Sequence, residues 1–384
     1  MRIQIKTLLF FSIMSLIIFE TFNNVGLGNS IFKLMKYAIT FIVFVICIIQ
    51  IMNNLKQNRK LDYIFELKRI GIVIVVFGGI SIFKIYQTKN FSLKTFEELM
   101  QLTIPVLYTF FIINFMNLKD IIRFMKYALA ISILAYILSI GIGKFTISNF
   151  LSISFINSYS PFESAPFAEI ASSLSAFFIY YRNKSPKGAI ISFIFCFLVF
   201  KRMLLLQAII LIIVSMLNLK DKDVNKILIF FSKIIFFIST LIFYFILQEK
   251  NAIMFEKYFG VNIGEFTMGR VYRIWYPLKG FISYGFGSTT EVLGYNLELD
   301  LVKILMELGI IALVIFIYSY FDLCRNNLYS FLIIGCIFAN LLFASCLTST
   351  VGWLFRMVCI ATIYYKRDEY NYMIKKRKYR VVLK

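Results

Sequence analysis

The sequence predicts an all-α, polytopic integral membrane protein with about 12 transmembrane helices. Hydrophobic residues make up 60% of the 384 residues, the mean hydropathy is +0.80, and only 16% of the residues are charged. A soluble globular domain carries about 25% charged residues, so this composition indicates a protein that resides in a bilayer. Apolar runs also recur along the whole length, and a helix needs about 20 apolar residues to cross the hydrocarbon layer.

Twelve apolar runs are the predicted spans. The first follows Arg2 and Lys6 and has no small-residue cleavage site behind it, so we interpret it as an anchor and not as a signal peptide. The later runs are separated by polar or charged segments, which become the loops. In order, the predicted spans are 7–22, 31–52, 70–86, 99–116, 122–142, 166–181, 189–200, 203–217, 228–247, 301–321, 328–347 and 351–365.

Lys201 and Arg202 interrupt a long apolar run, "LVFKRMLLLQ", which could form one helix or two. Cytoplasmic loops carry the excess of Lys and Arg. With a break at the pair, 25 basic residues fall on one side and 13 on the other, whereas one continuous helix gives 18 against 18. The break is therefore favoured. Both termini are then cytoplasmic, and residues 248–300 form a large extracytoplasmic loop between helices 9 and 10.

Composition and missing residue types exclude several classes of function. The net charge of +21 is concentrated in cytoplasmic loops and in the basic tail 366–384, where it sets topology and contacts anionic lipid, so nucleic-acid binding is not expected. Histidine is absent, which removes His-based acid–base chemistry and Ser-His triads. The six cysteines lack CxxC spacing, and no P-loop, dinucleotide fingerprint or compact carboxylate cluster is present. We expect no metal, no cofactor and a single membrane domain over residues 1–384.

The segment "GRVYRIWYPLKGFISYGFG" (269–287) concentrates charge and aromatic residues in the outer loop. Arg270 and Arg273 are spaced i, i+3 and would share one face of a helix. Two guanidinium groups side by side suit a pyrophosphate, because each offers planar paired donors to phosphate oxygens. The alternative is interfacial anchoring, with Tyr272 and Trp275 in an aromatic belt at the headgroup level.

Other charged residues also lie at the predicted outer face. Lys201 and Arg202 either face an anion there or extend to the outer headgroups, and Arg356 in the last span is open to the same two interpretations. Lys303 and Glu307 are spaced i, i+4 and could neutralise each other. The acids that could remove a proton are Glu163, Glu169, Glu298 and Asp300, and the sequence does not choose among them.

Four segments together resemble the Wzy-type polysaccharide polymerases, the capsule and O-antigen polymerases of the bacterial inner membrane. They are "PFESAPFAEIASSLSAFFIYY", "FLVFKRMLLL", the outer-loop "MGRVYRIW" followed by "YGFGS", and "ELDLVKILMELGIIALVIF". The resemblance covers roughly residues 155–320 and rests on order and spacing more than on identity. These polymerases are similar to the O-antigen ligases, which carry a functional histidine in the outer loop. This chain has no histidine and therefore departs from the ligase pattern.

The resemblance implies a metal-independent glycosyltransferase that joins oligosaccharide repeat units carried on undecaprenyl pyrophosphate at the outer face of the cytoplasmic membrane. Arg202, Arg270, Arg273 and Lys201 would bind pyrophosphate, and Trp275 and Tyr272 would contact sugar rings. Catalytic candidates are Glu163, Glu298 and Asp300. A chain-length regulator and a separate flippase are candidate partners. The alternatives are a ligase-like glycan transferase and a transporter or flippase for the same lipid-linked units, although a transporter needs polar groups deep in its spans and these spans have few.

Overall fold

The computed structural model describes residues 4–24, 30–58, 60–154, 159–267, 269–275 and 280–373 as an all-helical chain. In these ranges, β-structure is limited to two isolated bridges, Ser154–Tyr159 and Asp223–Asn327. An α-helix satisfies its backbone polar groups within one segment, as a lipid-exposed chain requires. The predicted all-α class is confirmed for the described residues, and the number of spans stays a prediction.

Five helices of the described chain are long and apolar enough to cross a membrane, by length and composition. They are α2 (Ser30–Lys56), α3 (Ile64–Thr88), α4 (Leu93–Phe115), α5 (Leu118–Ile140) and α10 (Lys226–Ile246). The other apolar helices are α1 (Ile5–Asn24), α7 (Ala165–Tyr180), α8 (Pro186–Val199), α9 (Arg202–Met216), α16 (Ile310–Asp322), α17 (Leu328–Phe343) and α18 (Thr350–Tyr365). Each predicted span overlaps one of these helices.

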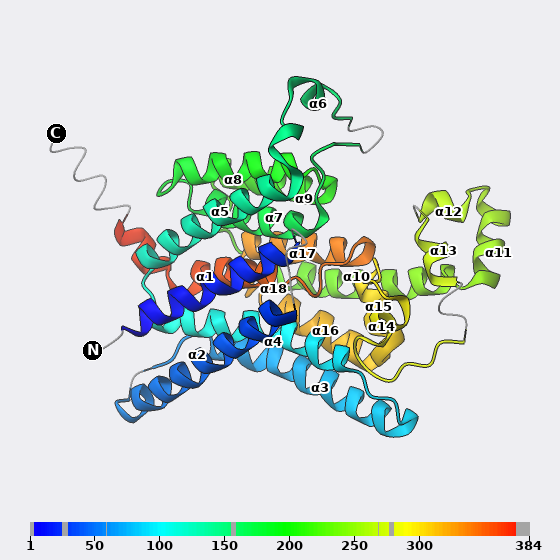
Figure 1. Ribbon diagram of the computed structural model, residues 1–384, viewed down its shortest axis with the longest axis horizontal. Coiled ribbons are helices and arrows are strands. Elements are labelled where there is room, and N and C mark those ends of the chain that lie inside the picture. Colours follow the sequence, from blue (N-terminus) through cyan, green and yellow to red (C-terminus); the bar gives the residue numbers. More distant parts are fainter. Residues whose placement is uncertain are drawn as a thin grey trace. The chain divides into compact units, whose positions relative to one another are not determined.

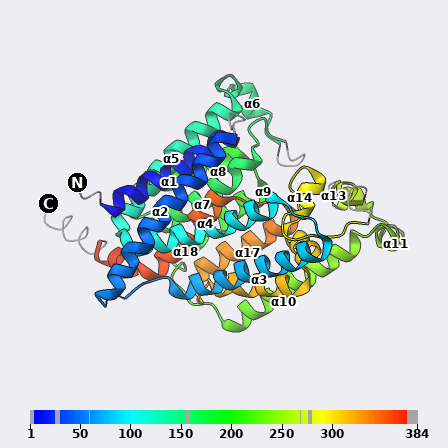
Figure 2. The ribbon, with the colours of Figure 1, turned by 60° about the horizontal axis from the view of Figure 1, so that its bottom comes forward.

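The contacts divide the chain into two compact units. The first contains Met1–Leu67, Ile104–Lys222 and Ser349–Lys384, and the second contains Lys68–Thr103 and Asp223–Thr348. In the first unit, α7 packs against α5, α8, α9 and α18, and α1 lies beside α2 and α5 (Figures 1 and 2). Residues 167–180 of α7 and 350–363 of α18 are all buried, so these two helices form the centre of the first unit.

The second unit packs α10, α16 and α17 with the short α15 (Asp300–Leu308). The predicted outer loop is largely helical, with α11 (Glu249–Phe259), α12 (Ile263–Phe266), α13 (Arg270–Trp275) and α14 (Ser288–Leu293). Figure 1 shows α11, α12 and α13 gathered beyond the end of α10. An apolar cluster that includes Leu247, Ala252, Ile263, Val271 and Leu299 attaches these helices to the start of α15.

Short polar caps fix where several of the helices begin. The side chains of Asn117, Asn225, Asn262 and Asn327 accept backbone N–H bonds at the first turns of α5, α10, α12 and α17. An asparagine in this position satisfies one of the N–H groups that a helix start leaves without an intrahelical acceptor. In both units, asparagines in the preceding loops therefore mark the residues at which these helices begin.

Two helix breaks test the sequence predictions. Helix α8 ends at Val199, Phe200 adopts a left-handed conformation with φ 54°, and α9 begins at Arg202. The predicted break at Lys201 and Arg202 is confirmed. The predicted span 301–321 is not one continuous helix, because Gly309 (φ 86°) separates α15 from α16. A residue with a side chain rarely adopts that backbone conformation. The glycine therefore permits a break where the apolar pattern alone predicts one continuous helix.

Lys233 is the one charged residue within the apolar stretch of α10 in the part of the chain that the structure describes. Its Nζ lies 2.6 Å from Asp322 Oδ1 at the end of α16, and Arg69 approaches the other oxygen of Asp322 at 3.2 Å. Charged side chains within a membrane span are costly unless they are paired. The ion pairs therefore allow α10 and α16 to keep these charges near one end of the second unit.

Candidate functional site

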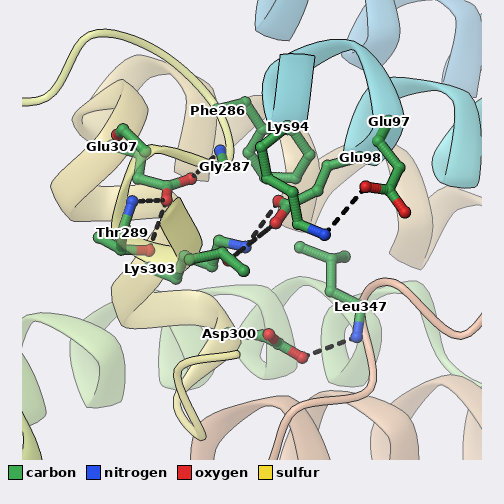
Figure 3. Close-up of polar contacts among 12 residues, drawn as sticks. Lys94, Glu97, Glu98, Phe286, Gly287, Thr289, Asp300, Lys303, Glu307 and Leu347 are labelled. Carbon is green, nitrogen blue, oxygen red and sulfur yellow. Dashed lines mark hydrogen bonds and ion pairs between the residues drawn. The ribbon is translucent and has the colours of Figure 1, made fainter. Parts of the chain in front are cut away.

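A buried ion pair joins α4 to α15 in the second unit. Lys303 Nζ lies 2.7 and 2.6 Å from the two carboxylate oxygens of Glu98, and each side chain is only 1% exposed. Figure 3 shows the two side chains directed at each other. Thr290 completes the site, because its hydroxyl donates to Glu98 Oε1 at 2.8 Å and lies 2.8 Å from Lys303 Nζ. The ammonium and the carboxylate are thus paired and hydrogen-bonded, as buried charges require.

Glu307, one turn further along α15, holds the glycine-rich loop that follows the outer-loop helices. Its carboxylate accepts from the backbone N–H groups of Gly287 (2.8 Å) and Thr289 (2.7 Å) and from the Thr289 hydroxyl (2.5 Å) (Figure 3). Its backbone carbonyl accepts from the Ser283 hydroxyl at 2.6 Å. Lys303 therefore hydrogen-bonds to Glu98 and also interacts favourably with the charge of Glu307, as the i, i+4 spacing suggested, while the Glu307 oxygens bind the loop.

Two glycines let this loop approach the helices closely. Gly285 has φ 130°, and a Cβ there would lie 2.9 Å from Ser81 Cβ on α3. Gly287 has φ 89°, and its Cβ would lie 3.2 Å from the Lys94 backbone on α4. Between them, the Phe286 N–H donates to the Ser81 hydroxyl at 2.9 Å. Only glycine combines these conformations with this proximity, which gives the "YGFGS" segment a structural reason.

Tyr284 begins the same segment and is half-buried. Burial, followed by a hydrogen bond with Glu291, raises the pKa of Tyr284 to about 12. The phenol is thus less acidic than an ordinary tyrosine side chain, which already keeps its proton at neutral pH.

Asp300 opens α15 and is buried. Its Oδ2 accepts from the backbone N–H groups of Cys346 and Leu347 at 2.6 and 2.7 Å. Figure 3 shows the bond to Leu347. The carboxylate thereby fixes the turn that follows α17. Asp300, a predicted catalytic candidate, therefore stabilises this turn. Its role as a base stays a prediction.

The structure brings together two predicted site residues of the outer loop. Arg270 Nε lies 3.3 Å from Glu298 Oε2, and Arg270 Nη1 donates to the Thr267 carbonyl at 3.2 Å. Both charged side chains are partly exposed. The buried Arg270 Nε–H has no hydrogen-bond acceptor among the described residues, because the geometry towards Glu298 is that of an ion pair only. A guanidinium donor and a carboxylate thus lie together on α13 and the segment before α15.

The remaining predicted residues of the outer loop lie around α13. Tyr272 is exposed, and its ring packs against Gly264, where a Cβ would come within 2.6 Å of the ring. The backbones of Arg273 and Trp275 belong to α13, which confirms that Arg270 and Arg273 share one helix. The side chains of Arg273 and Trp275 lie outside the described part of the structure.

Three further predicted residues lie in the first unit. Lys201 Nζ is 2.6 Å from Glu163 Oε1, so the segments before α7 and α9 are joined by a half-exposed ion pair. Arg202, the first residue of α9, is exposed and has no ion pair or hydrogen bond from its side chain to the described residues. Arg202 belongs to the first unit and Arg270 to the second, so the predicted combination of the two in one pyrophosphate site stays a prediction.

Sequence reasoning missed Glu98. The available signal was an acid next to the predicted span 99–116, because an ionisable group in an apolar helix needs a partner. That partner lies 205 residues away in the chain, and no spacing rule connects the two. The described residues contain no group of three or more acidic or cysteine side chains that could hold a metal ion. Metal independence stays a prediction.

Comparisons of the chain with family models, with curated proteins and with solved structures find no match.

Proposed function

We propose that the protein is a Wzy-type polymerase that joins undecaprenyl-pyrophosphate-linked oligosaccharide repeat units at the outer face of the bacterial cytoplasmic membrane. The observation that carries the proposal is the Arg270–Glu298 pair, in which a cation suited to phosphate lies 3.3 Å from a candidate base. The partial exposure of both side chains supports a role towards a ligand. The resemblance of the four sequence segments supports the class of reaction.

The proposed topology has 12 spans with both termini in the cytoplasm. The five long apolar helices and the shorter ones support this arrangement. In it, α15 and α16 together form the tenth span, and α11 to α14 lie outside the cell membrane's hydrocarbon layer. The tail from residue 366 is cytoplasmic, and the structure describes its residues 366–373.

The proposed reaction transfers the glycan of one lipid-linked chain to the end of another. An acceptor hydroxyl oxygen attacks the anomeric carbon of the donor sugar, and the bond from that carbon to the pyrophosphate oxygen breaks. The hydroxyl proton passes to a carboxylate, for which Glu298 is the leading candidate beside Glu163 and Asp300. Undecaprenyl pyrophosphate leaves, and Arg270 with Arg273 stabilises its developing negative charge, supported by Arg202 and Lys201. Trp275 and Tyr272 contact the sugars.

Replacing Arg270 by alanine is expected to shorten or abolish the polymer. The change removes charge-assisted hydrogen bonds of roughly 1.5–3 kcal/mol each, and more if they strengthen in the transition state. Arg270→Lys keeps the charge but loses the planar fork, so it should also lose much of the activity. The measurement is polymer length on a gel, with the membrane abundance of each variant determined in parallel.

Lys257→Ala is the matched control, because Lys257 is an exposed cation of the same loop on α11. It should leave polymer length unchanged. Long polymer from Arg270→Ala at normal abundance would contradict the proposed site. It would favour the interfacial anchoring alternative, in which lysine is tolerated almost fully.

The topology makes a separate prediction for cysteine labelling. A thiol introduced at Lys257 should react with an impermeant reagent added outside the cell, and one at Lys222, in the exposed loop before α10, should react only after the membrane is opened. Background labelling is expected to be low because five of the six native cysteines are buried. The reverse pattern would place the 248–300 loop in the cytoplasm and remove the proposed function.

A further inference from the structure

The two central helices of the first unit share a buried ion pair. Arg356 on α18 donates from Nη2 to Glu169 Oε2 on α7, and the Arg356 side chain is 0% exposed. The helices are close here, because a Cβ on Gly352 would lie 3.1 Å from Glu169 Cβ. Arg356 therefore does not extend to the headgroups, which was one of its two sequence-based interpretations.

Several buried hydrogen-bond donors on α7, α9 and α18 have no acceptor among the described residues. Arg356 Nε and Nη1 have no hydrogen-bond partner in the described structure, and the same is true of Gln207 Nε2 on α9. Gln207 is fixed beside α7, because the Ser172 hydroxyl donates to its Oε1 at 3.3 Å. Ser172 lies about one turn from Glu169 on α7, so Gln207 and Arg356 bind neighbouring turns of the same helix. Ser175, one turn beyond Ser172, also has a buried hydroxyl without a partner there. A buried polar group without a partner costs free energy and calls for an explanation.

Glu169 and the two donor residues lie near the N-terminal ends of three helices. Glu169, Gln207 and Arg356 lie in the first two turns of α7, α9 and α18, and each of these helices has at least 15 residues. In the proposed topology, all three N-termini face the outside of the cell, so the donors lie slightly below the outer surface.

We propose that Arg356 and Gln207 form a binding site for a phosphoryl oxyanion, and that Glu169 occupies this site as an internal competitor when no ligand is bound. A phosphoryl group offers several acceptor oxygens and no obligatory donor, which complements the two guanidinium nitrogens and the amide nitrogen. The single carboxylate of Glu169 satisfies only Nη2. The identification of the natural ligand as a lipid-linked pyrophosphate rests on the proposed function. The binding of an oxyanion does not rest on it.

Trp353 provides a direct measurement. Its ring centroid lies 5.7 Å from Arg356 Cζ, and the chain has only one other tryptophan, Trp275. The full-length Trp275→Phe protein, purified in detergent, therefore reports fluorescence from the site alone. The probes are inorganic pyrophosphate and undecaprenyl phosphate, which contain no sugar, so the removal of Trp275 does not affect a sugar contact.

Saturable fluorescence changes are expected, and Arg356→Lys should weaken binding by about tenfold or more because charge-assisted hydrogen bonds are lost. Gln207→Leu should weaken it less. Glu169→Gln should tighten binding several-fold, because it removes the competing negative charge. If the ion pair were purely structural, Glu169→Gln would weaken the binding of the probes and would not tighten it. Thermal unfolding of each variant identifies any that fail to fold, and in that case Glu169→Gln and Gln207→Leu decide the question.

A response to both probes would mean that the site is open to water, and a response to the lipid alone would identify a lipid headgroup; either supports the inference. No response to either probe, equal binding by Arg356→Lys, or weaker binding by folded Glu169→Gln overturns it. The outcome is independent of the polymer assay on Arg270. Binding at Arg356 together with long polymer from Arg270→Ala would retain the oxyanion site and contradict the proposed site at Arg270.

Discussion

Replacing Lys303 by methionine is expected to lower the free energy of unfolding by about 3–5 kcal/mol. Methionine nearly matches the length of lysine, so the main effect on stability is the loss of the positive charge. The Glu98 carboxylate, with a side chain only 1% exposed, would remain buried without its cation. Thermal unfolding of the purified protein in detergent measures the loss, and the abundance of the variant in membranes reports its consequence in cells.

Two further variants separate charge from packing. Glu98→Met combined with Lys303→Met should recover most of the stability, because replacing both partners of a buried pair by apolar side chains of similar volume is often nearly neutral. Lys94→Met is the matched control on the same helix. Its pair with Glu97, at 2.9 Å, is partly exposed and should contribute about 0–1 kcal/mol (Figure 3). The interpretation fails if Lys303→Met is no more harmful than Lys94→Met.

Glu307→Ala is expected to have the second large effect. It removes the acceptor of two backbone N–H groups and one hydroxyl in the loop around Gly287 and Thr289. A buried donor left without an acceptor costs about 1–3 kcal/mol, so the three together should lower the free energy of unfolding by roughly 3 kcal/mol or more. Hydrogen exchange measured by mass spectrometry should show faster exchange over residues 285–291.

Glu265→Ala is the control for this experiment, because Glu265 is an exposed acid on α12. It should change neither unfolding nor exchange in that loop. Slow exchange over residues 285–291 in Glu307→Ala would show that Ser81 and the glycine conformations hold the segment without the carboxylate.

The helical fold could be predicted where one local signal was sufficient. The charge bias of the loops located the break at Lys201 and Arg202, and the i, i+3 spacing correctly placed Arg270 and Arg273 on one helix. Gly309 could not be identified in the same way. Glycine occurs within membrane helices, and its positive φ depends on how α15 packs.

Partners of the charged residues were less predictable, because they are distant in sequence. Lys303 interacts electrostatically with its local neighbour Glu307, but its hydrogen bonds go to the distant Glu98, because the glycine-rich loop binds the Glu307 oxygens. Arg356 and Glu169 are 187 residues apart, and each looked like an isolated charge near a span end. Pattern rules detect neighbours on one helix and do not detect contacts between helices.

The break at Gly309 divides a predicted span into two short helices, one of which depends on a distant partner. Helix α15 has 9 residues and α16 has 13, so at 1.5 Å per residue they rise about 14 and 20 Å, and neither covers the ~30 Å hydrocarbon layer alone. The first of the two carries Lys303, whose neutralising carboxylate was synthesised 205 residues earlier. Because Glu98 precedes Lys303 by 205 residues, the buried pair between α4 and α15 cannot form until most of the chain has been synthesised.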